Sequence, residues 1–475
     1  MTLATDAYIG GAWRAAPARF EVRDPADGAV VADVADCDEA MIDAAIGAAM
    51  RAFPSWRATP GRERGTKLAA FADRMLGDER VLAELCTAEN GKPIKEAIAE
   101  VRYAASFLRW FAEQAERDPR ETIASERAGQ DLSATREPIG PCALITPWNF
   151  PYAMITRKLG AALAAGCTVV IKPAEQTPLS ALALSAHAHA VGIPAGVVNV
   201  VPASDGGRIG GYLVRAPGIR KVSFTGSTEV GRAIQRAAAD DLKRVSLELG
   251  GNAPLLVFAD ADLDVATAGS IIAKFRNTGQ TCIAANRFLV ERSVAPAFQA
   301  SLVAAIGKLV LGRGRDPGVD LGPLIDDAAV AKVARLVGDA IARGAQPVLG
   351  SPPAPGSRMV APVVLAGVRD DMQLWREEIF GPVVAIRTFA DDAEAIRLAN
   401  DTEFGLAAYA FTRDPARAER LRDQLEVGML GVNEAAISMA RAPFGGVKHS
   451  GYGREGSTHG LDDYTQLKFV AARLP

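Results

Sequence analysis

The sequence predicts an α/β protein in which parallel strands form the framework of two or three domains. Its 475 residues are too many for one ordinary hydrophobic core. From Pro141 onward, short apolar strands alternate with helical segments, which is typical of parallel α/β sheets. The hydrophobic fraction of 49% and the charged fraction of 23% are those of a soluble globular chain.

The region before the first parallel strand is predicted to be mainly helical scaffold. Residues 8–13 indicate a short hairpin around two glycines. Pro93 suits a first helical position, where its missing N–H would be unpaired anyway. Residues 120–139 are polar and break the helical pattern, with Gly129 at a turn between two extended halves. The expected helices have the bounds 39–53, 61–76 and 93–117.

Polar and aromatic side chains follow the first parallel strand, residues 142–146. Pro147 stops this strand, and Trp148 and Asn149 stand directly after it. Open α/β sheets bind their ligands at the carboxyl ends of strands. Trp148 and Asn149 are therefore candidate site residues.

The second strand, residues 167–171, leads into a charged loop. Lys172 and Glu175 lie in this loop, again at the carboxyl end of a strand. Thr177 and Pro178 then begin a helix, with a hydroxyl cap and a proline in the first position. Without further context, both charges would be explained as solvated loop residues.

A candidate phosphate site follows the strand 221–225, where Gly226 and Ser227 open a helix. A glycine lets the backbone approach a ligand, and a helix N-terminus favours an anion. The spacing from Gly226 to Gly231 is G-x-x-x-x-G rather than G-x-G-x-x-G, and no lysine follows Gly231. In isolation an ordinary capped helix explains this turn equally well.

A second α/β segment is expected after Gly251. Its helices are predicted to run through 259–277, 296–309 and 328–343, with a surface turn at 352–355. Residues 442–456 are a glycine-rich loop, and the tail YTQLKFVAARL alternates as an edge strand does.

The strongest candidates for chemistry are Glu248 and Cys282. Glu248 alternates with apolar neighbours at the end of a strand, before Gly250 and Gly251, which leave it room to move. Cys282 lies among small uncharged residues, and a thiolate is a strong nucleophile. Taken singly, Glu248 would be a surface charge and Cys282 a buried inert thiol. With Asn149 they offer a base, a nucleophile and an amide donor for chemistry on a carbonyl group.

Asn149 in ITPWNFP, Glu248 in SLELGG and Cys282 in KFRNTGQTCIAANR occur in an order that resembles the NAD(P)-dependent aldehyde dehydrogenase superfamily. The resemblance extends from about Tyr8 to the C-terminus and is closest to the succinate-semialdehyde dehydrogenase branch. It implies a Rossmann-like NAD-binding domain, an α/β catalytic domain and a β-hairpin oligomerisation arm. The implied bounds are 1–119 and 140–249 for the NAD-binding domain, 250–440 for the catalytic domain, and 120–139 and 458–475 for the arm.

The resemblance also implies a mechanism and a cofactor site. Cys282 attacks the aldehyde, Asn149 and the Cys282 backbone N–H hold the oxyanion, and Glu248 activates the water that hydrolyses a thioester. Lys172 and Glu175 would hold the adenosine ribose, and the glutamate would repel a 2′-phosphate, so NAD is expected and NADP is the less favoured alternative. The other implied cofactor contacts are Trp148, Gly226, Ser227, Glu378 and Phe380.

By the same resemblance, Arg157, Arg276 and Ser438 would bind a carboxylate at the far end of the substrate. Arg157 lies eight residues after Asn149, close to two helical turns, so both can face one cavity. A guanidinium suits a carboxylate, although each arginine alone could be a surface or ion-paired residue. Succinate semialdehyde is the expected substrate. Glutarate or 2-oxoglutarate semialdehyde, a broad aldehyde range and a non-catalytic structural role stay open.

Bulk properties limit the partners and the compartment. The net charge is −3 and there is no basic run, so we expect no positive electrostatic potential that would attract nucleic acid or an anionic membrane. Five cysteines without paired spacing predict free thiols in the cytoplasm, and four histidines without a cluster predict no metal site. The N-terminus lacks the pattern of a signal peptide. Residues 176–204 are uncharged but are interrupted by prolines, so a buried helix, a turn and a strand are expected. A homodimer or homotetramer is expected from the resemblance.

Overall fold

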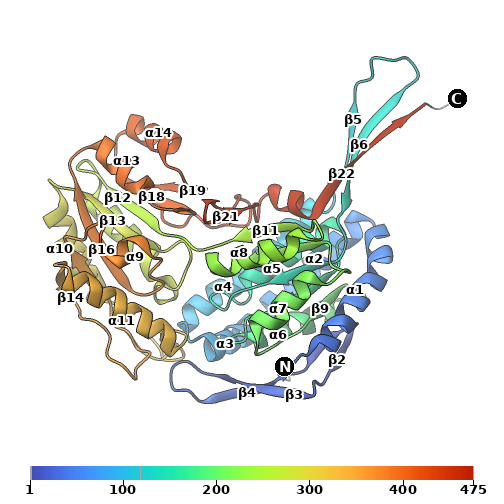
Figure 1. The fold of residues 1–475 in the computed structure, drawn as a ribbon, viewed down its shortest axis with the longest axis horizontal. Coiled ribbons are helices and arrows are strands. Elements are labelled where there is room, and N and C mark those ends of the chain that lie inside the picture. Colours follow the sequence, from blue (N-terminus) through green and yellow to red (C-terminus); the bar gives the residue numbers. More distant parts are fainter. Residues whose placement is uncertain (1–2, 118, 474–475) are drawn as a thin grey trace.

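The computed structural model describes residues 3–117 and 119–473. Figure 1 shows two α/β halves side by side, one coloured blue to green and the other yellow to orange. A narrow arm of strands projects from the first half and carries the C-terminal strand. The α/β class predicted from the sequence is confirmed.

The first half is built on a sheet with parallel strands at its centre. β7, β8 and β9 lie in the reverse of their chain order, and β10 and β11 continue on the other side of β7. This is the Rossmann-like order, and its direction reverses between β7 and β10. β1 and β21 join the edges in the antiparallel sense. The full order is β2 (Ala12–Arg14), β1 (Ala7–Ile9), β9 (Val198–Val200), β8 (Val169–Lys172), β7 (Cys142–Ile145), β10 (Lys221–Thr225), β11 (Arg244–Glu248) and β21 (Gly451–Tyr452).

Helices cover both faces of this sheet because two separate hydrophobic clusters lie against it. One cluster takes side chains from α1 to α6, and the other takes them from α1, α7 and α8. The bounds are α1 (Glu39–Ala58), α2 (Gly61–Gly77), α3 (Glu79–Asn90), α4 (Ile94–Gln114), α5 (Ala153–Ala165), α6 (Pro178–Ala190), α7 (Gly206–Arg215) and α8 (Thr228–Ala239).

Three details of the helical region differ from the prediction. The first helix continues through Pro54 to Ala58, since a proline in the last turns of a helix removes only one hydrogen bond. α3 was not predicted. Its short apolar face is buried by packing on α4 and α6, which local periodicity does not reveal. Pro93 caps α4 instead of occupying its first turn.

The second half has its own sheet, in which all neighbours are parallel except β14 and β15. Its order is β14 (Gln346–Leu349), β15 (Val363–Ala366), β16 (Val383–Phe389), β13 (Ala285–Glu291), β12 (Ala253–Val257), β18 (Ala407–Phe411) and β19 (Met429–Val432). The helices around it are α9 (Leu263–Phe275), α10 (Ala295–Ile306), α11 (Asp327–Ala342), α12 (Gln373–Arg376), α13 (Asp392–Asn400) and α14 (Pro415–Gln424).

The projecting arm consists of β5 (Arg120–Ile123), β6 (Asp131–Pro138) and β22 (Thr465–Ala472). The predicted hairpin at 120–139 and the predicted C-terminal strand are confirmed, and they pair with each other. β22 is antiparallel to β6 over its whole length, from Thr465 opposite Pro138 to Ala472 opposite Asp131. One edge of β22 has no partner strand in the described chain, and Leu467, Phe469 and Val470 are exposed on it.

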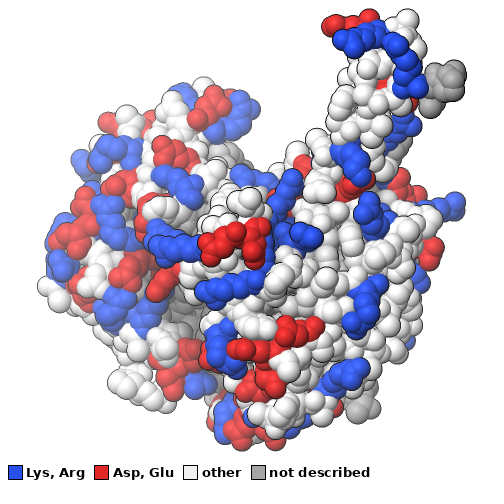
Figure 2. Space-filling view, turned by 45° about the vertical axis from the view of Figure 1, so that its right-hand side comes forward, with Lys and Arg blue, Asp and Glu red and all other residues white. Residues whose placement is uncertain are grey.

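The surface fits the nearly neutral composition. In Figure 2, Lys and Arg side chains are interspersed with Asp and Glu on the face shown, without a continuous area of one sign. Among the described residues, no helix has both the length and the apolar character needed to cross a membrane. The uncharged stretch 176–204 folds as α6, a turn and β9, as predicted.

Candidate active site

Cys282 lies on a tightly held loop between α9 and β13. The helix ends at Phe275, two residues earlier than predicted, because Asn277 and Thr278 adopt left-handed backbone angles with φ of 48° and 57°. Gly279 follows with φ of 79°, and a Cβ there would overlap the Gly381 carbonyl oxygen. The loop is therefore fixed by strain and close contact rather than by regular structure.

The glycines before the second sheet bring Glu248 and Cys282 together. A Cβ at Gly251 would overlap the carbonyl oxygen of Cys282. Glu248 is the last residue of β11, three positions earlier. The sequence suggested that the glycines give Glu248 room to move, whereas the structure shows that Gly251 permits a backbone contact.

Glu248 is a buried carboxyl group without a hydrogen-bond partner. Its side chain is 3% exposed, and neither carboxyl oxygen has a partner within the described residues. The strand pattern suggested an exposed strand end, but β21 covers this edge of the sheet. Burial, followed by the negative charge of Glu455, raises the pKa of Glu248 well above its usual value, and Arg157 and Lys158 oppose this shift.

The Cys282 thiol is half-buried and uncharged in this state. Burial raises its pKa to about 12, while the nearby Arg157 charge lowers it and the Glu378 and Glu248 charges raise it. A thiolate requires a base or a new positive charge beside it. Glu248 acts on this thiol, and its carboxyl oxygens have no hydrogen-bond partner among the described residues.

Asn149 is held rigidly at the carboxyl end of β7. Its backbone carbonyl oxygen accepts hydrogen bonds from Lys92 Nζ at 2.7 Å and from Asn277 Nδ2 at 3.0 Å. Its Nδ2 donates to the Gln280 carbonyl oxygen at 3.2 Å, which leaves a second N–H on the same amide. The side chain is 4% exposed, so this donor is fixed and largely dry.

A cavity of about 250 Å³ lies at the carboxyl ends of β7 and β10, where the strand order of the first sheet reverses. This is where such sheets bind nucleotides. Five predicted cofactor residues line it, together with Asn149 and Cys282. The complete lining is Pro147, Trp148, Asn149, Thr225, Gly226, Ser227, Leu249, Gly250, Cys282, Ala329, Lys332, Glu378 and Phe380.

The walls of this cavity are ordered by contacts among the predicted cofactor residues. Trp148 and Phe380 meet edge to face, with ring centroids 5.6 Å apart. Glu378 accepts a hydrogen bond from the Gly251 N–H at 2.9 Å, and burial raises its pKa to about 7. Ser227 caps α8 by accepting from the Val230 N–H at 3.3 Å, as predicted.

Lys172 and Glu175 lie outside this lining, beside the start of α7. Lys172 is the buried last residue of β8 instead of a loop residue, and its Nζ lies 3.7 Å from Glu175 Oε2. A Cβ at Gly206 would lie 3.0 Å from Lys172 Nζ and 3.1 Å from Glu175 Oε2. The pair therefore faces the N-terminal turn of α7.

The hydroxyl cap predicted at Thr177 is wrong. Thr177 holds the cap position but makes no cap hydrogen bond. Glu89, on α3, accepts instead from the Leu179 and Ser180 N–H groups at 2.8 and 2.9 Å. A carboxylate from a distant helix therefore satisfies the first turn of α6.

A second, much smaller cavity of about 10 Å³ lies on the other side of Cys282. It brings together the three residues predicted to bind a carboxylate. Cys282 is the one residue shared by the two linings. The complete lining is Tyr103, Phe150, Met154, Arg157, Arg276, Thr281, Cys282, Ile283, Ser438 and Phe444.

Arg157 is fully buried, and only part of its guanidinium is hydrogen-bonded. Its Nε and the Lys158 Nζ both donate to the Glu455 carboxylate. The Arg157 guanidinium lies 3.8 Å from the Phe444 ring centroid, and its Nη2 has no partner among the described residues. One nitrogen of a buried cation is therefore left unpaired beside the cavity.

Arg276 and Ser438 complete this group. The Arg276 guanidinium stacks 4.9 Å from the Phe150 ring centroid and makes no hydrogen bond or ion pair within residues 3–117 and 119–473. Ser438 Oγ shares a hydrogen bond with the Tyr103 hydroxyl. Stacking leaves the edge of a guanidinium free to donate, and both guanidinium side chains line the same small cavity.

Sequence reasoning missed several residues that support the site. They come from the connection before α4, from α4 and α5, and from the glycine-rich loop, and no local motif marks them. Buried charge in a helix was the available signal, since such residues are seldom buried without a partner. The missed residues are Lys92, Glu100, Tyr103, Lys158 and Glu455.

Comparison with known proteins identifies close relatives along almost the whole chain. The model described as "Aldehyde dehydrogenase family" matches residues 13–470. Glutarate-semialdehyde dehydrogenase of Pseudomonas aeruginosa is 49% identical over 467 residues, which is 98% of this chain and 96% of that protein. The NADP(+) succinate-semialdehyde dehydrogenase of Escherichia coli is 48% identical and covers 98% of both chains. The crystal structure of succinate-semialdehyde dehydrogenase from Burkholderia pseudomallei has a TM-score of 0.97 at 48% identity, covering 99% and 98% of the two chains.

Proposed function

Because this chain belongs to the aldehyde dehydrogenase family, we propose that it oxidises the semialdehyde of a short dicarboxylic acid to the dicarboxylate, with NAD as cofactor. Succinate semialdehyde is the proposed substrate, and glutarate semialdehyde is the alternative, since relatives with either name are similar. The observation that supports the substrate class is that Arg157, with one unpartnered nitrogen, and Arg276, stacked on Phe150, line one small cavity together with Cys282.

The cavity at the sheet reversal fits a dinucleotide. Gly226 packs against the Phe224 ring, which a Cβ there would overlap, and the buried Thr225 hydroxyl in the wall has no hydrogen-bond partner among the described residues. Ser227 and the first turn of α8 would hold the pyrophosphate, and Glu378 would accept the hydroxyls of the nicotinamide ribose. The nicotinamide cofactor, when bound, accepts the hydride released on oxidation.

Preference for NAD over NADP rests on Glu175. Its carboxylate stands with Lys172 beside Gly206, where the adenosine ribose would lie. A fixed negative charge there repels a 2′-phosphate and accepts hydrogen bonds from ribose hydroxyls. The E. coli relative is described as NADP(+)-dependent, so this preference is a property proposed for this chain itself.

We assign the nucleophile to Cys282. Its sulfur attacks the aldehyde carbon, and the proton of the thiol passes to the Glu248 carboxylate. The new oxyanion accepts hydrogen bonds from the second N–H of the Asn149 side-chain amide and from the Cys282 backbone N–H. Each such donor lowers the barrier by about 3–4 kcal/mol. Loss of hydride converts the thiohemiacetal to a thioester on Cys282.

After it has released the Cys282 proton to solvent, Glu248 acts as general base in the second half of the reaction. Its ionised carboxylate takes a proton from water, the water oxygen adds to the thioester carbon, and the carbon–sulfur bond breaks to release the acid and the thiol. Because the pKa of Glu248 is raised, this step should accelerate as pH rises through that pKa. The absence of hydrogen bonds on either oxygen leaves the carboxyl free to reorient.

Arg157 and Arg276, with Ser438, would bind the distal carboxylate of the substrate. The two guanidiniums approach the cavity from α5 and from the loop before Cys282, and each is stacked on a phenylalanine. Such stacking fixes the plane of a guanidinium while leaving its N–H groups available. A substrate with aldehyde and carboxylate at opposite ends is then held with its carbonyl at the sulfur.

We propose the domain division given by the sequence, with residues 1–119 and 140–249 binding the cofactor and 250–440 carrying the nucleophile. The arm, 120–139 and 458–475, would join subunits as a homodimer or homotetramer. The exposed apolar side chains of β22 and its open edge support that role, since an unpaired strand invites another.

The deciding experiment compares aldehydes with and without the distal carboxylate. With NAD, kcat/KM is measured for succinate semialdehyde, glutarate semialdehyde, butanal and pentanal, so that each semialdehyde has a partner of equal carbon count. A preference of about a hundredfold or more for the semialdehydes is expected. Equal rates would refute carboxylate recognition, and the larger of the two semialdehyde values would identify the chain length.

A further inference from the structure

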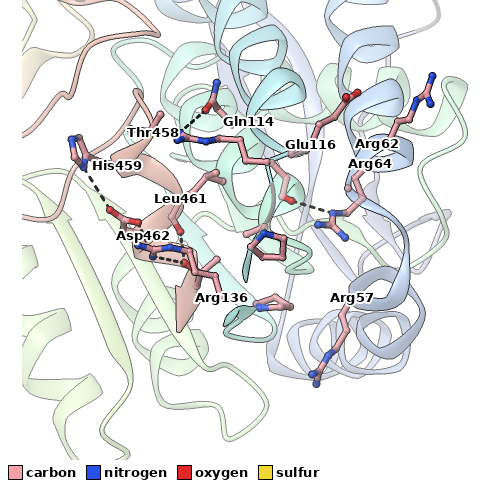
Figure 3. Close-up of a pocket in the computed structure, with 18 residues that line it drawn as sticks. Arg57, Arg62, Arg64, Gln114, Glu116, Arg136, Thr458, His459, Leu461 and Asp462 are labelled. Atoms are coloured by element: carbon pink, nitrogen blue, oxygen red, sulfur yellow. Dashed lines mark hydrogen bonds and ion pairs between the residues drawn. The ribbon is translucent and has the colours of Figure 1, made fainter. Parts of the chain in front are cut away.

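A cavity of about 700 Å³ lies at the base of the arm and shares no residue with either cavity of the candidate active site. Figure 3 shows Arg57, Arg62 and Arg64 on one side of it, and Arg136, His459 and Asp462 on the opposite side. The walls come from α1, α2, α5, the end of α4, β6 and the segment before β22. Its volume is that of a small-molecule site.

Two glycines create this cavity by letting α2 lie against the end of α4. A Cβ at Gly61 would overlap the carbonyl oxygen of Ala115, and a Cβ at Gly65 would overlap that of Ala112. The contact places the first turn of α2, with Arg62 and Arg64, directly beside the residues that follow α4.

Positive charge dominates the lining. Five arginines face two carboxylates, whereas the whole chain has a net charge of −3. Ion pairs neutralise only part of this excess: Arg136 lies 2.8 Å from Asp462, and Arg57 lies 3.6 Å from Glu137. The five arginines are Arg57, Arg62, Arg64, Arg117 and Arg136.

Three of these guanidiniums have no carboxylate partner among the described residues. Arg64 donates only to carbonyl oxygens, of Thr59 and, at 3.1 Å, of Ala164, and burial lowers its pKa. Arg117 donates to the neutral Gln114 amide oxygen at 3.2 Å. The Arg62 guanidinium, in the first turn of α2, makes neither a hydrogen bond nor an ion pair within the described residues. α2 also starts without a side-chain cap, so its positive end adds to the same field.

We propose that the cavity at the arm base binds a compact polyanion, a small molecule with at least two phosphate or carboxylate groups. Guanidiniums pair with both groups in the same two-pronged way. The arginines lie on opposite walls of the cavity, which suits a ligand whose negative groups are separated. Apart from the His459 imidazole, no described lining residue has an aromatic ring, so a nucleobase would have no platform on which to stack.

Calorimetric titration of the full-length protein with inorganic pyrophosphate tests this site without turnover, so its outcome is independent of the proposed function. Saturable binding is expected at low ionic strength, weakening as salt is added. Citrate and inorganic phosphate form the other arms. Tighter binding of pyrophosphate than citrate would identify the ligand as a phosphate, the reverse would identify a polycarboxylate, and both should exceed inorganic phosphate.

Arg62→Gln and Arg117→Gln remove charge without touching the core, since both side chains are exposed, whereas Arg64 holds the end of α5 and is left intact. Each variant should weaken pyrophosphate binding about tenfold or more. Glu116→Gln, which removes a lining carboxylate, should strengthen it. Arg422→Gln, on exposed α14, is the matched control and should change nothing. No saturable heat in the parent, or equal affinity in the parent, Arg62→Gln and Arg117→Gln, would overturn the proposal.

Discussion

Arg276→Gln is the sharpest probe of how the substrate is held. Arg276 makes no hydrogen bond or ion pair within the described residues, so its loss leaves no buried partner behind. Arg157 is less suitable, because its Nε also binds Glu455 and its charge also acts on Glu248 and Cys282. Glutamine keeps most of the side-chain length and can still donate one hydrogen bond.

The magnitude follows from how far Arg276 is buried. Loss of one partner from a buried, hydrogen-bonded charge pair costs about 2–5 kcal/mol. Arg276 is half-buried, so the lower end applies, and about 2 kcal/mol corresponds to roughly a thirtyfold loss in kcat/KM for succinate semialdehyde. Butanal has no carboxylate to lose, so its kcat/KM should stay within about twofold of the parent.

The assay is initial-rate NADH formation with both aldehydes, for the parent, Arg276→Gln and the exposed control Arg292→Gln. The informative quantity is the ratio of the two kcat/KM values within each protein, which cancels differences in active fraction. An unchanged ratio in Arg276→Gln would refute carboxylate binding by this arginine. An equal loss for both aldehydes would assign Arg276 to the shape of the Cys282 loop instead.

Three further predictions concern the base and the cofactor. Glu248→Gln should give a single, slowed burst of NADH followed by arrest in rapid-mixing kinetics, because the thiol loses the carboxylate that takes its proton and water is no longer activated to hydrolyse the thioester; steady turnover would contradict this role. Glu455→Gln removes a negative charge that raises the pKa of Glu248, so the rise of kcat with pH should move to lower pH. Urea titration of the same variant should show a loss of about 3–5 kcal/mol, since Arg157 and Lys158 stay buried without a carboxylate, and an unmoved pH profile would reject the coupling. Glu175→Ser should raise the NADP-to-NAD ratio of kcat/KM by about tenfold or more, and a constant ratio would show that Glu175 does not select the cofactor.

Local signals in the sequence were enough to predict the parallel strands and the edge of the sheet at which the candidate site lies. Strands that end in proline or glycine put Asn149 and Gly226 at the carboxyl edge of one sheet, and the observed strand order confirms that edge as the reversal point. Arg157 was expected near Asn149 from helical spacing, and α5 does bring it to the cavity.

Residues that act through distant pairing could not be predicted in this way. Glu455 meets Arg157 across 298 positions, and Glu89 caps α6 across 90 positions. The burial of Glu248 depends on β21, a two-residue strand with no periodicity of its own. The contacts of Glu455 and β21 follow from how the glycine-rich loop folds back on the first sheet, and the Glu89 cap follows from the packing of α3 on α6; the order of residues alone specifies neither.

The two cavities of the candidate site meet at a single shared residue, Cys282. A ligand on either side covers the same sulfur, although the two ligands occupy separate spaces. The rate at which an alkylating reagent consumes this thiol therefore registers occupancy from both directions. One chemical signal can thus report the affinity of the cofactor and of a carboxylate analogue independently, and their joint effect shows whether one ligand prepares the protein for the other.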